Sequence, residues 1–190
     1  MTKKIGVLAL QGAVTEHLQA LTKLGVTATA VKSPADLEGV EGLIIPGGES
    51  TAIGRLIREQ GLEEPLRKFF DAGKAIFGTC AGLILCSTDS SHAPDELRLG
   101  FIDIAVERNG FGRQVDSFEA LLAFVGLAEP VEAVFIRAPY IRYIGDDVRV
   151  LASIDGKIVA AENDRVLVTA FHPELTDDLT VFEYFLKKVG

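Results

Sequence analysis

The sequence predicts an α/β domain in which a mainly parallel sheet lies between two layers of helices. In the first half of the chain, short apolar runs alternate with segments whose apolar residues recur at helical spacing, which indicates strand–helix–strand units. In the second half, strand-like segments follow one another closely, and Asp155-Gly156 is a hairpin-turn signal that favours antiparallel pairing. We therefore expect residues 1–190 to form a single three-layer domain with antiparallel strands added late.

The first half supplies the alternating elements. Ile5 to Leu10 is a continuous apolar run, as expected of a strand that is buried on both faces. A helical pattern begins at Val14 and is ended by Gly25. Further strands are expected at 26–31, 43–45 and 74–78, and further helices at 51–60, at 63–72 and from residue 83.

The second half is expected to contribute mostly strands. They are placed at 101–106, 131–136, 148–154, 158–161 and 166–170. A last helix is expected at about 177–189, because its apolar residues form one stripe: Val181, Phe182, Phe185, Leu186 and Val189.

The composition argues against several broad classes of protein. With 48% hydrophobic residues and a mean hydropathy of +0.28, the chain has enough apolar material for a full core, so disorder is not expected. The net charge of −8 argues against a general nucleic-acid-binding surface. No apolar run approaches the roughly 18 residues that cross a membrane, and the start is interpreted as a first strand, not a signal peptide. We expect a cytoplasmic protein that binds neither nucleic acid nor membrane, with two cysteines that form no disulfide framework.

The pentapeptide Gly78-Thr79-Cys80-Ala81-Gly82 is the central observation about chemistry. It lies between an expected strand and an expected helix, which is the G-x-nucleophile-x-G pattern of a nucleophile elbow with Cys in place of Ser. Glycines suit the flanking positions, because a sharp strand-to-helix turn brings them against neighbouring backbone. The start of a helix also favours the thiolate form of Cys80. The alternative is a buried core cysteine, which is the interpretation we prefer for Cys86 in its apolar run.

The motif His172-Pro173-Glu174 supplies the predicted base. Proline favours an extended His172, and side chains two apart in an extended chain point the same way, so Glu174 is expected to orient the imidazole by a hydrogen bond. The alternative is a turn after a strand with a solvated glutamate. His17 falls on a helical pattern and His92 in a polar loop, and both are expected to be structural or exposed.

The stretch Pro46-Gly47-Gly48-Glu49-Ser50 follows another expected strand. Such a turn needs no function, but ligands of open α/β sheets lie beyond the carboxyl ends of strands, where Cys80 also lies. The backbone N–H groups of Gly48 and Ala81 are therefore expected to form an oxyanion hole. Because glycine peptides reorient at low steric cost, Gly47 is a candidate modulator of that hole, together with Gln11. For Gln11, a helix-entry residue without a chemical role is an equal alternative.

Together these motifs resemble those of class I, triad-type glutamine amidotransferases. Within that group, six blocks resemble the glutaminase subunits of pyridoxal 5'-phosphate synthases. The blocks lie at 8–14, 46–51, 78–84, 107–109 with 111–118, 135–139 and 171–176, so the match runs nearly end to end. The resemblance implies a flavodoxin-like three-layer fold with a mainly parallel sheet. The segments 88–99 and 140–147 match no block.

The resemblance also implies an activity, which is hydrolysis of L-glutamine to L-glutamate and ammonia by Cys80, His172 and Glu174. No cofactor and no metal are implied. The ammonia would pass to a synthase subunit in a large hetero-oligomeric complex, which builds pyridoxal 5'-phosphate from a pentose phosphate and a triose phosphate. The glutamine-binding residues implied are Gly48, Glu49, Ser50, Arg108, Ile136 and Arg137. An arginine suits the α-carboxylate of glutamine, and a glutamate suits its α-ammonium group. Without the resemblance, Arg108 and Arg137 would be taken for partners in surface salt bridges.

Two alternative functions remain open at this stage. The elbow and the His-Pro-Glu motif would look the same in a subunit that serves a different synthase or in a lone γ-glutamyl hydrolase, although 113–118 and 137–139 favour the pyridoxal branch. The second alternative is a non-catalytic binding module on the same scaffold. Such a module is expected to have lost Cys80, His172 or Glu174, and all three are present.

Overall fold

A run of parallel strands forms the centre of the molecule. The computed structural model describes residues 2–90, 96–111 and 117–190. The parallel strands are β1 (Lys4–Leu8), β2 (Thr27–Val31), β3 (Gly42–Ile45), β4 (Ala75–Thr79) and β12 (Val166–Thr169), in the spatial order β2-β1-β3-β4-β12. This is the strand order of flavodoxin-like folds, in which ligands bind beyond the carboxyl ends of the strands.

Antiparallel strands extend the same sheet beyond β12. They are β11 (Lys157–Glu162), β9 (Tyr140–Ile144) and β6 (Ile104–Glu107), with β5 (Asp89–Ser90) pairing parallel to β6 at the edge. β10 (Arg149–Ile154) forms a hairpin with β11, and Asp155-Gly156 is its turn, as predicted. A separate two-stranded sheet pairs β7 (Ser117–Leu122) with β8 (Val131–Ile136).

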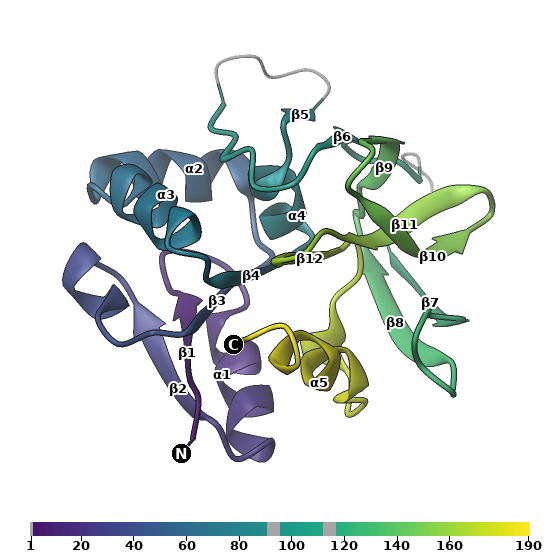
Figure 1. The fold of residues 1–190 in the computed structure, drawn as a ribbon. Coiled ribbons are helices and arrows are strands. Elements are labelled where there is room, and N and C mark those ends of the chain that lie inside the picture. Colours follow the sequence, from purple (N-terminus) through teal and green to yellow (C-terminus); the bar gives the residue numbers. More distant parts are fainter. Residues whose placement is uncertain (1, 91–95, 112–116) are drawn as a thin grey trace.

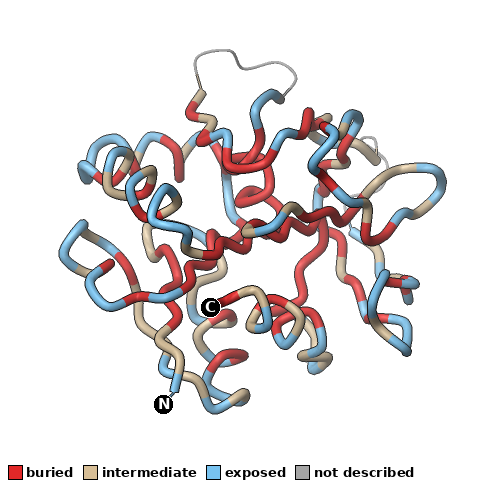
Figure 2. The backbone as a smooth tube through the Cα atoms, viewed as in Figure 1, coloured by how far each residue is buried: buried red, intermediate tan, exposed pale blue. Residues whose placement is uncertain are grey.

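Helices cover both faces of the central strands (Figure 1). One face carries α1 (Val14–Lys23) and α5 (Thr180–Leu186), and the other carries α2 (Ser50–Glu59), α3 (Glu63–Asp71) and α4 (Ala81–Cys86). Short 3-10 helices lie at η1 (Pro34–Leu37) and η2 (Pro173–Leu175). Figure 2 shows the buried backbone running along the central strands, where β3, β4 and β12 are buried at every residue. The predicted three-layer arrangement is therefore confirmed.

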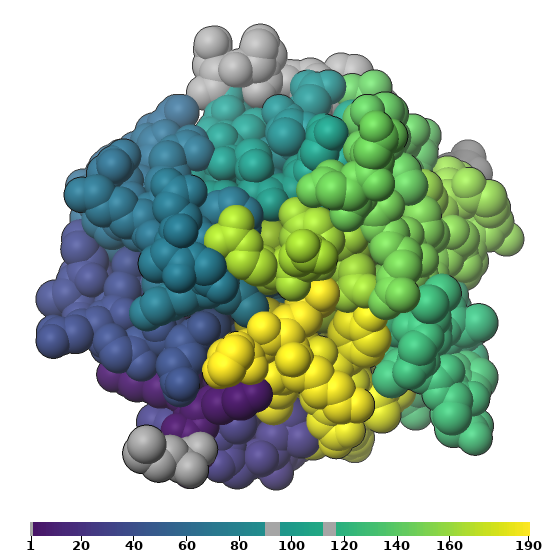
Figure 3. Space-filling model, in the orientation of Figure 1, coloured from purple at the N-terminus to yellow at the C-terminus, as the bar shows by residue number. Residues whose placement is uncertain are grey.

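The two ends of the chain pack together. Lys3 Nζ donates hydrogen bonds to the carbonyl oxygens of Leu186 and Val189, at 2.8 and 2.9 Å. In the space-filling view the yellow C-terminal segment accordingly lies against the purple N-terminal one (Figure 3). The last helix is shorter than expected, since it begins at Thr180 and ends at Leu186.

The carboxyl ends of β1, β3, β4 and β12 bring four loops to one edge of the sheet, because parallel neighbours end on the same side. These loops contain Gln11, the Pro46–Ser50 stretch, Cys80 and His172. Residues from four distant parts of the sequence are thereby placed together. Within the described ranges, no helix combines the length and the apolar character that crossing a membrane requires.

Candidate active site

Cys80 lies in a sharp turn between β4 and α4. Its φ of 51° and ψ of −102° are rare for a residue with a side chain. The glycines on either side explain how the turn fits: a Cβ on Gly82 would lie 1.9 Å from the carbonyl oxygen of Ile45, and one on Gly78 would lie 2.6 Å from that of Gly82. The predicted elbow geometry is present, with Cys80 itself only 8% exposed.

His172 and Glu174 form a hydrogen-bonded pair beyond the end of β12. The imidazole Nδ1 lies 3.2 Å from Oε1 and 3.1 Å from Oε2 of Glu174, and the backbone N–H of His172 donates to the carbonyl of Val134 at 2.8 Å. The predicted contact is present, but the predicted reason is wrong. Residues Pro173–Leu175 form the 3-10 helix η2, so a tight turn and not an extended segment brings Glu174 back to the imidazole.

The electrostatics of the pair favour a charged imidazole. Burial alone would lower the pKa of His172, but its hydrogen bonds with Cys80 and with Glu174 outweigh burial and raise the pKa to about 10. His172 therefore lies between a potential nucleophile and a fully buried carboxylate. An imidazole that is oriented by a carboxylate and interacts with a thiol is the arrangement that activates a cysteine nucleophile.

Gly47 of the Pro46–Ser50 loop lies directly against His172 and Cys80. A Cβ on Gly47 would lie 2.6 Å from Cε1 of His172 and 3.3 Å from Cβ of Cys80, so only glycine fits. The carbonyl of Gly47 accepts a hydrogen bond from the N–H of Ala13 at 3.1 Å. Because C=O and N–H point in opposite directions across a trans peptide, the N–H of Gly48 points away from Ala13.

A cleft of about 520 Å³ opens beside Cys80. Its walls contain Cys80 and most of the residues that the resemblance implied: Gly48, Glu49, Ser50, Ala81, Arg108 and Arg137. Ile136 does not line the cleft, but its carbonyl oxygen lies 4.0 Å from Sγ of Cys80. Three further residues line the cleft without having been singled out in the sequence: Ile84, Asn109 and Pro139.

A model of the SNO glutamine amidotransferase family matches residues 7–190. The chain belongs to that family. This SNO-family chain is 52% identical to the pyridoxal 5'-phosphate synthase subunit PdxT of Carboxydothermus hydrogenoformans, over 98% of this chain and 97% of the relative. It is 54% identical to the subunit of the same name from Shouchella clausii, over 98% and 95% of the two chains. The family resemblance seen in the sequence blocks is thereby confirmed.

Solved structures agree with the fold of this SNO-family chain. A crystal structure of a glutamine amidotransferase superposes with a TM-score of 0.94 at 48% identity and covers 98% of both chains. The structure of PurLQS from Thermotoga maritima is similar at a TM-score of 0.70 and 17% identity, over 100% of each chain, which shows the fold alone. The predicted fold class, a mainly parallel amidotransferase sheet with added antiparallel strands, is confirmed.

An ion-pair network fills one wall of the cleft in the SNO-family chain. Arg108 donates to Glu96 at 2.8 Å and to Oγ of Ser50 at 3.0 Å, and it lies 3.7 Å from Glu49. Glu49 is also the N-cap of α2, since its carboxylate accepts from the N–H groups of Thr51 and Ala52 at 3.1 and 2.7 Å. The guanidinium of Arg108 is thus held in place from several sides.

Gln11 contacts the glycine loop, but one peptide further along than expected. Its Oε1 accepts a hydrogen bond from the N–H of Glu49 at 2.9 Å, whereas the carbonyl of Gly47 is held by Ala13. A Cβ on Gly48 would lie 2.4 Å from the same Oε1, so the loop and Gln11 are tightly packed. This contact favours a loop-holding role over a simple helix-entry role for Gln11.

One histidine of the SNO-family chain makes a contact that the sequence did not suggest. His17 is fully buried, and its Nε2 lies 3.5 Å from Oε1 of Glu174 and 3.3 Å from Oγ1 of Thr79. Nothing in the sequence pattern pointed to this contact, because α1 and the His-Pro-Glu motif are far apart along the chain. His92 lies outside the described residues. Burial raises the pKa of Cys86 to about 12, in agreement with a core cysteine.

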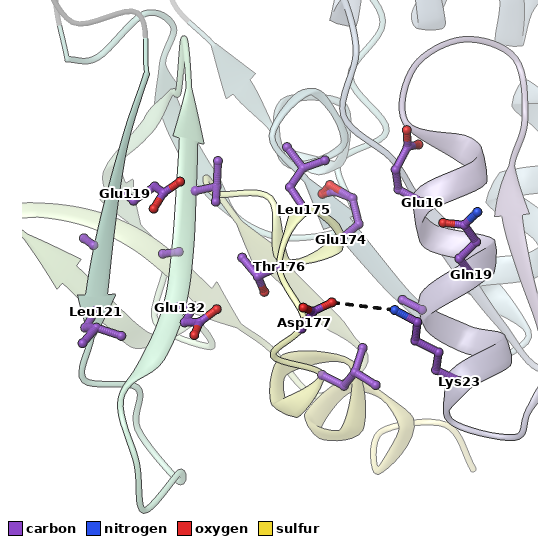
Figure 4. A pocket seen from close by; sticks show the side chains of 15 residues that line it. Glu16, Gln19, Lys23, Glu119, Leu121, Glu132, Glu174, Leu175, Thr176 and Asp177 are labelled. Atoms are coloured by element: carbon purple, nitrogen blue, oxygen red, sulfur yellow. Dashed lines mark ion pairs between the residues drawn. The ribbon is translucent and has the colours of Figure 1, made fainter.

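A second cleft, of about 730 Å³, lies on the other side of η2, between α1 and the β7–β8 sheet (Figure 4). Its walls contain the acidic residues Glu16, Glu119, Glu132, Glu174 and Asp177, and Lys23 lies 3.8 Å from Asp177. Cys80 and His172 do not line it, so it is not where the reaction would take place. The described residues contain no group of three or more His, Cys, Asp or Glu side chains suited to a metal ion.

Proposed function

We propose that this chain is the glutaminase subunit of a pyridoxal 5'-phosphate synthase and hydrolyses L-glutamine to L-glutamate and ammonia. Its relatives of more than 50% identity are subunits of that synthase. The single observation that carries the chemistry is the position of His172, whose Nδ1 lies 3.1 Å from buried Glu174 and whose pKa is raised by both Cys80 and Glu174. The family match over residues 7–190 supports treating the chain as one glutaminase domain.

The proposed reaction is acyl transfer through a thioester. The sulfur of Cys80 attacks the side-chain amide carbon of glutamine, and the N–H groups of Gly48 and Ala81 stabilise the oxyanion. His172 protonates the leaving ammonia, and a γ-glutamyl thioester remains on Cys80. Water that has lost a proton to His172 then releases glutamate and regenerates the thiol. Glu174 keeps the imidazole oriented throughout.

The cleft suits glutamine at its polar end. Arg108 and Arg137 would pair with the α-carboxylate, and Glu49 with the α-ammonium. Ser50 and Gly48 lie on the same wall, and the carbonyl of Ile136 lies beside the sulfur. No organic cofactor or metal takes part in this proposal.

Ammonia is expected to pass to the synthase subunit within a large hetero-oligomeric complex. We further propose that the isolated chain is a weak glutaminase and that the synthase subunit activates it. The physical reason is that the oxyanion N–H belongs to the Gly47-Gly48 peptide, whose orientation a docked partner can fix. The segment 112–116, which contributed to favouring the pyridoxal branch, lies outside the described residues.

Glutamine labelled with ¹⁵N in its side-chain amide tests the proposal. Ammonia and glutamate should form slowly with the chain alone and much faster with the synthase subunit, and the label should appear in pyridoxal 5'-phosphate. Equal rates with and without the synthase subunit would exclude activation but leave the chemistry intact. Ammonia release without label in pyridoxal 5'-phosphate would favour an amidotransferase that serves a different synthase, and no release in either case would favour a binding module.

A further inference from the structure

His17 is a fully buried histidine that takes no part in the mechanism above. It lies on α1, and its Nε2 faces two oxygen atoms, Oε1 of Glu174 at 3.5 Å and Oγ1 of Thr79 at 3.3 Å. The ring of Phe182 packs edge-on against it, with centroids 5.6 Å apart. The imidazole therefore lies between the acid of the triad and the residue that precedes Cys80.

The surroundings of His17 keep its imidazole neutral. Burial is the largest effect and lowers its pKa to about 4, although Glu174 and Glu16 act in the opposite direction. His172 adds to the lowering, because it is the positively charged group that faces His17. A neutral imidazole has one N–H donor and one acceptor nitrogen, so the position of its proton decides what it can do.

The contacts favour the tautomer with the proton on Nε2. Nδ1 of His17 has no hydrogen-bond partner among the described residues. A proton on Nδ1 would leave a buried N–H unpaired and would turn the lone pair of Nε2 toward the carboxylate of Glu174, which is unfavourable on both counts. A proton on Nε2 instead points toward Glu174 and Thr79 and leaves only an acceptor unpaired.

A neutral donor at this place suits the task of Glu174. Its carboxylate is 0% exposed, and a buried carboxylate needs donors to remain charged. An N–H from His17 supplies one without adding a second positive charge that would compete with His172. The distance of 3.5 Å is long for a hydrogen bond, and catalytic contacts of this kind commonly shorten when substrate binds.

We propose that His17 is a positioning residue of the glutaminase reaction, whose neutral imidazole, protonated at Nε2, holds the Glu174 carboxylate toward His172. This inference rests on the proposed glutaminase function. His17 does not line the cleft beside Cys80, so its effect on glutamine is indirect. Loss of its donor should lower kcat and leave KM for glutamine nearly unchanged.

Two matched substitutions test the proposal in the presence of the synthase subunit. His17→Gln keeps an N–H donor at a similar distance from the backbone, whereas His17→Met has a similar length, suits a helix and has no donor. We expect His17→Met to lower kcat about ten-fold with little change in KM, and His17→Gln to recover most of that loss. An unchanged kcat in His17→Met, or equal losses in both variants, would overturn the proposal. Absence of glutaminase activity in the unmodified chain would instead contradict the proposed function.

A spectroscopic measurement on the unmodified chain tests the tautomer independently of how the variants fold. The chain has three histidines, so ¹⁵N-labelled imidazoles can be distinguished, and His17 is recognised by its contact with the ring of Phe182. We expect a neutral ring that carries its proton on Nε2 at neutral pH. A proton on Nδ1 alone would show that Nε2 cannot donate to Glu174, and a charged ring would contradict the neutral donor that is proposed. Either result would refute the inference.

Discussion

At the scale of the residue, the site depends on how little space surrounds its reactive groups. Cys80 is held in a backbone conformation that is rare for a residue with a side chain, and Gly47 leaves no room for a methyl group above His172. The imidazole has its Nδ1 held by Glu174, and the interaction with Cys80 raises its pKa further. Substitutions of Cys80 and His172 that add no bulk should therefore affect the reaction much more than they affect the fold.

Cys80→Ala should lower glutaminase activity at least a thousand-fold, because no other nucleophile lies at the elbow. Cys86→Ala is the matched control, since Cys86 is fully buried in the core. It should keep activity within about three-fold of the unmodified chain and lose about 1 kcal/mol of stability. Ammonia release and urea unfolding of the two variants measure both effects. Substantial activity in Cys80→Ala would remove Cys80 as the nucleophile.

His172→Asn should be nearly as damaging as Cys80→Ala, since the base and the nucleophile act as a unit. Glu174→Gln should cost less, because the carboxylate orients the imidazole and does not itself react. In the Glu174→Gln variant, the amide side chain can still occupy the space of the carboxylate but cannot balance the positive charge of His172. The values of kcat for the two variants test the assignment of His172 as the base and Glu174 as the orienting acid. A lower kcat for Glu174→Gln than for His172→Asn would require these roles to be reassigned.

Arg137→Ala should raise KM for glutamine about ten-fold, by loss of a charged contact with the α-carboxylate. Arg55→Ala serves as the control, because Arg55 is 68% exposed and its ion pair within the described part of the chain is with Glu59, one helical turn away. Steady-state kinetics with an unaltered KM for Arg137→Ala would take this residue out of the binding site.

At the scale of the element, the elbow joins β4 to α4 against the neighbouring strand β3. Gly82 is the point of closest approach, because a Cβ there would meet the carbonyl of Ile45. The helix can pack against the sheet only if this position lacks a side chain. The same close packing places Ala81, and with it a predicted oxyanion donor, beside Cys80.

Gly82→Ala should destabilise the fold by about 3 kcal/mol, because β3 or α4 has to move to admit the methyl group. Gly73→Ala is the comparison, since a Cβ at Gly73 meets nothing within 4 Å and is opposed only by its φ of 88°. That substitution should cost about 1–2 kcal/mol. Urea unfolding of both variants gives the difference. Equal losses would mean that the approach to Ile45 does not limit residue 82.

The elements that could be predicted are those with a strong local pattern. The continuous apolar runs of β1, β3, β4 and β12 and the Gly-x-Cys-x-Gly spacing were sufficient, because burial and sharp turning leave clear signatures. β7 was not predicted, since its sequence Ser-Phe-Glu-Ala-Leu-Leu favours a helix as much as a strand. β9 was missed although Tyr-Ile-Arg-Tyr-Ile is rich in residues that favour strands.

Two features of the site could not have come from local patterns. His172 keeps a non-helical backbone before proline, with φ −108° and ψ 89°, but the chain then tightens into a 3-10 turn at Pro173–Leu175, which the expectation of an extended segment did not include. The contact of His17 with Glu174 depends on how α1 packs beneath the sheet, which no spacing along the chain reveals. Sequence patterns identify chemical groups, whereas their supporting contacts depend on packing between distant segments.

At the scale of the whole molecule, Glu162 ties the antiparallel extension to the last helix. Its carboxylate on β11 pairs with Arg149 on β10, accepts from Tyr184 on α5 at 2.7 Å and lies 2.8 Å from Nζ of Lys188. Burial alone would raise the pKa of Glu162, but these partners lower it below its usual value of 4.5. Ion pairs and a hydrogen bond, in addition to strand pairing, therefore hold β10 and β11 against the C-terminal segment.

Glu162→Gln should lower the free energy of unfolding by about 2 kcal/mol at neutral pH, because it removes charged hydrogen bonds. Since the folded-state pKa is depressed, this stabilisation is complete above pH 4.5 and is lost as the pH falls through the folded pKa. The difference from the unmodified chain should therefore shrink in acid. Glu59→Gln, which breaks only an exposed pair, is the control. A difference that stays constant in acid would contradict the ionic origin.

The position of α1 links two parts of the site that would otherwise be independent. The amide of Ala13, just before the helix, holds the carbonyl of Gly47, and His17 reaches Glu174 from the same helix. A helix of this length moves as a rigid body. A tilt of α1 would therefore displace both the loop that contains Gly47 and the carboxylate of Glu174. The loop and the carboxylate of the proposed site would then move together and not independently.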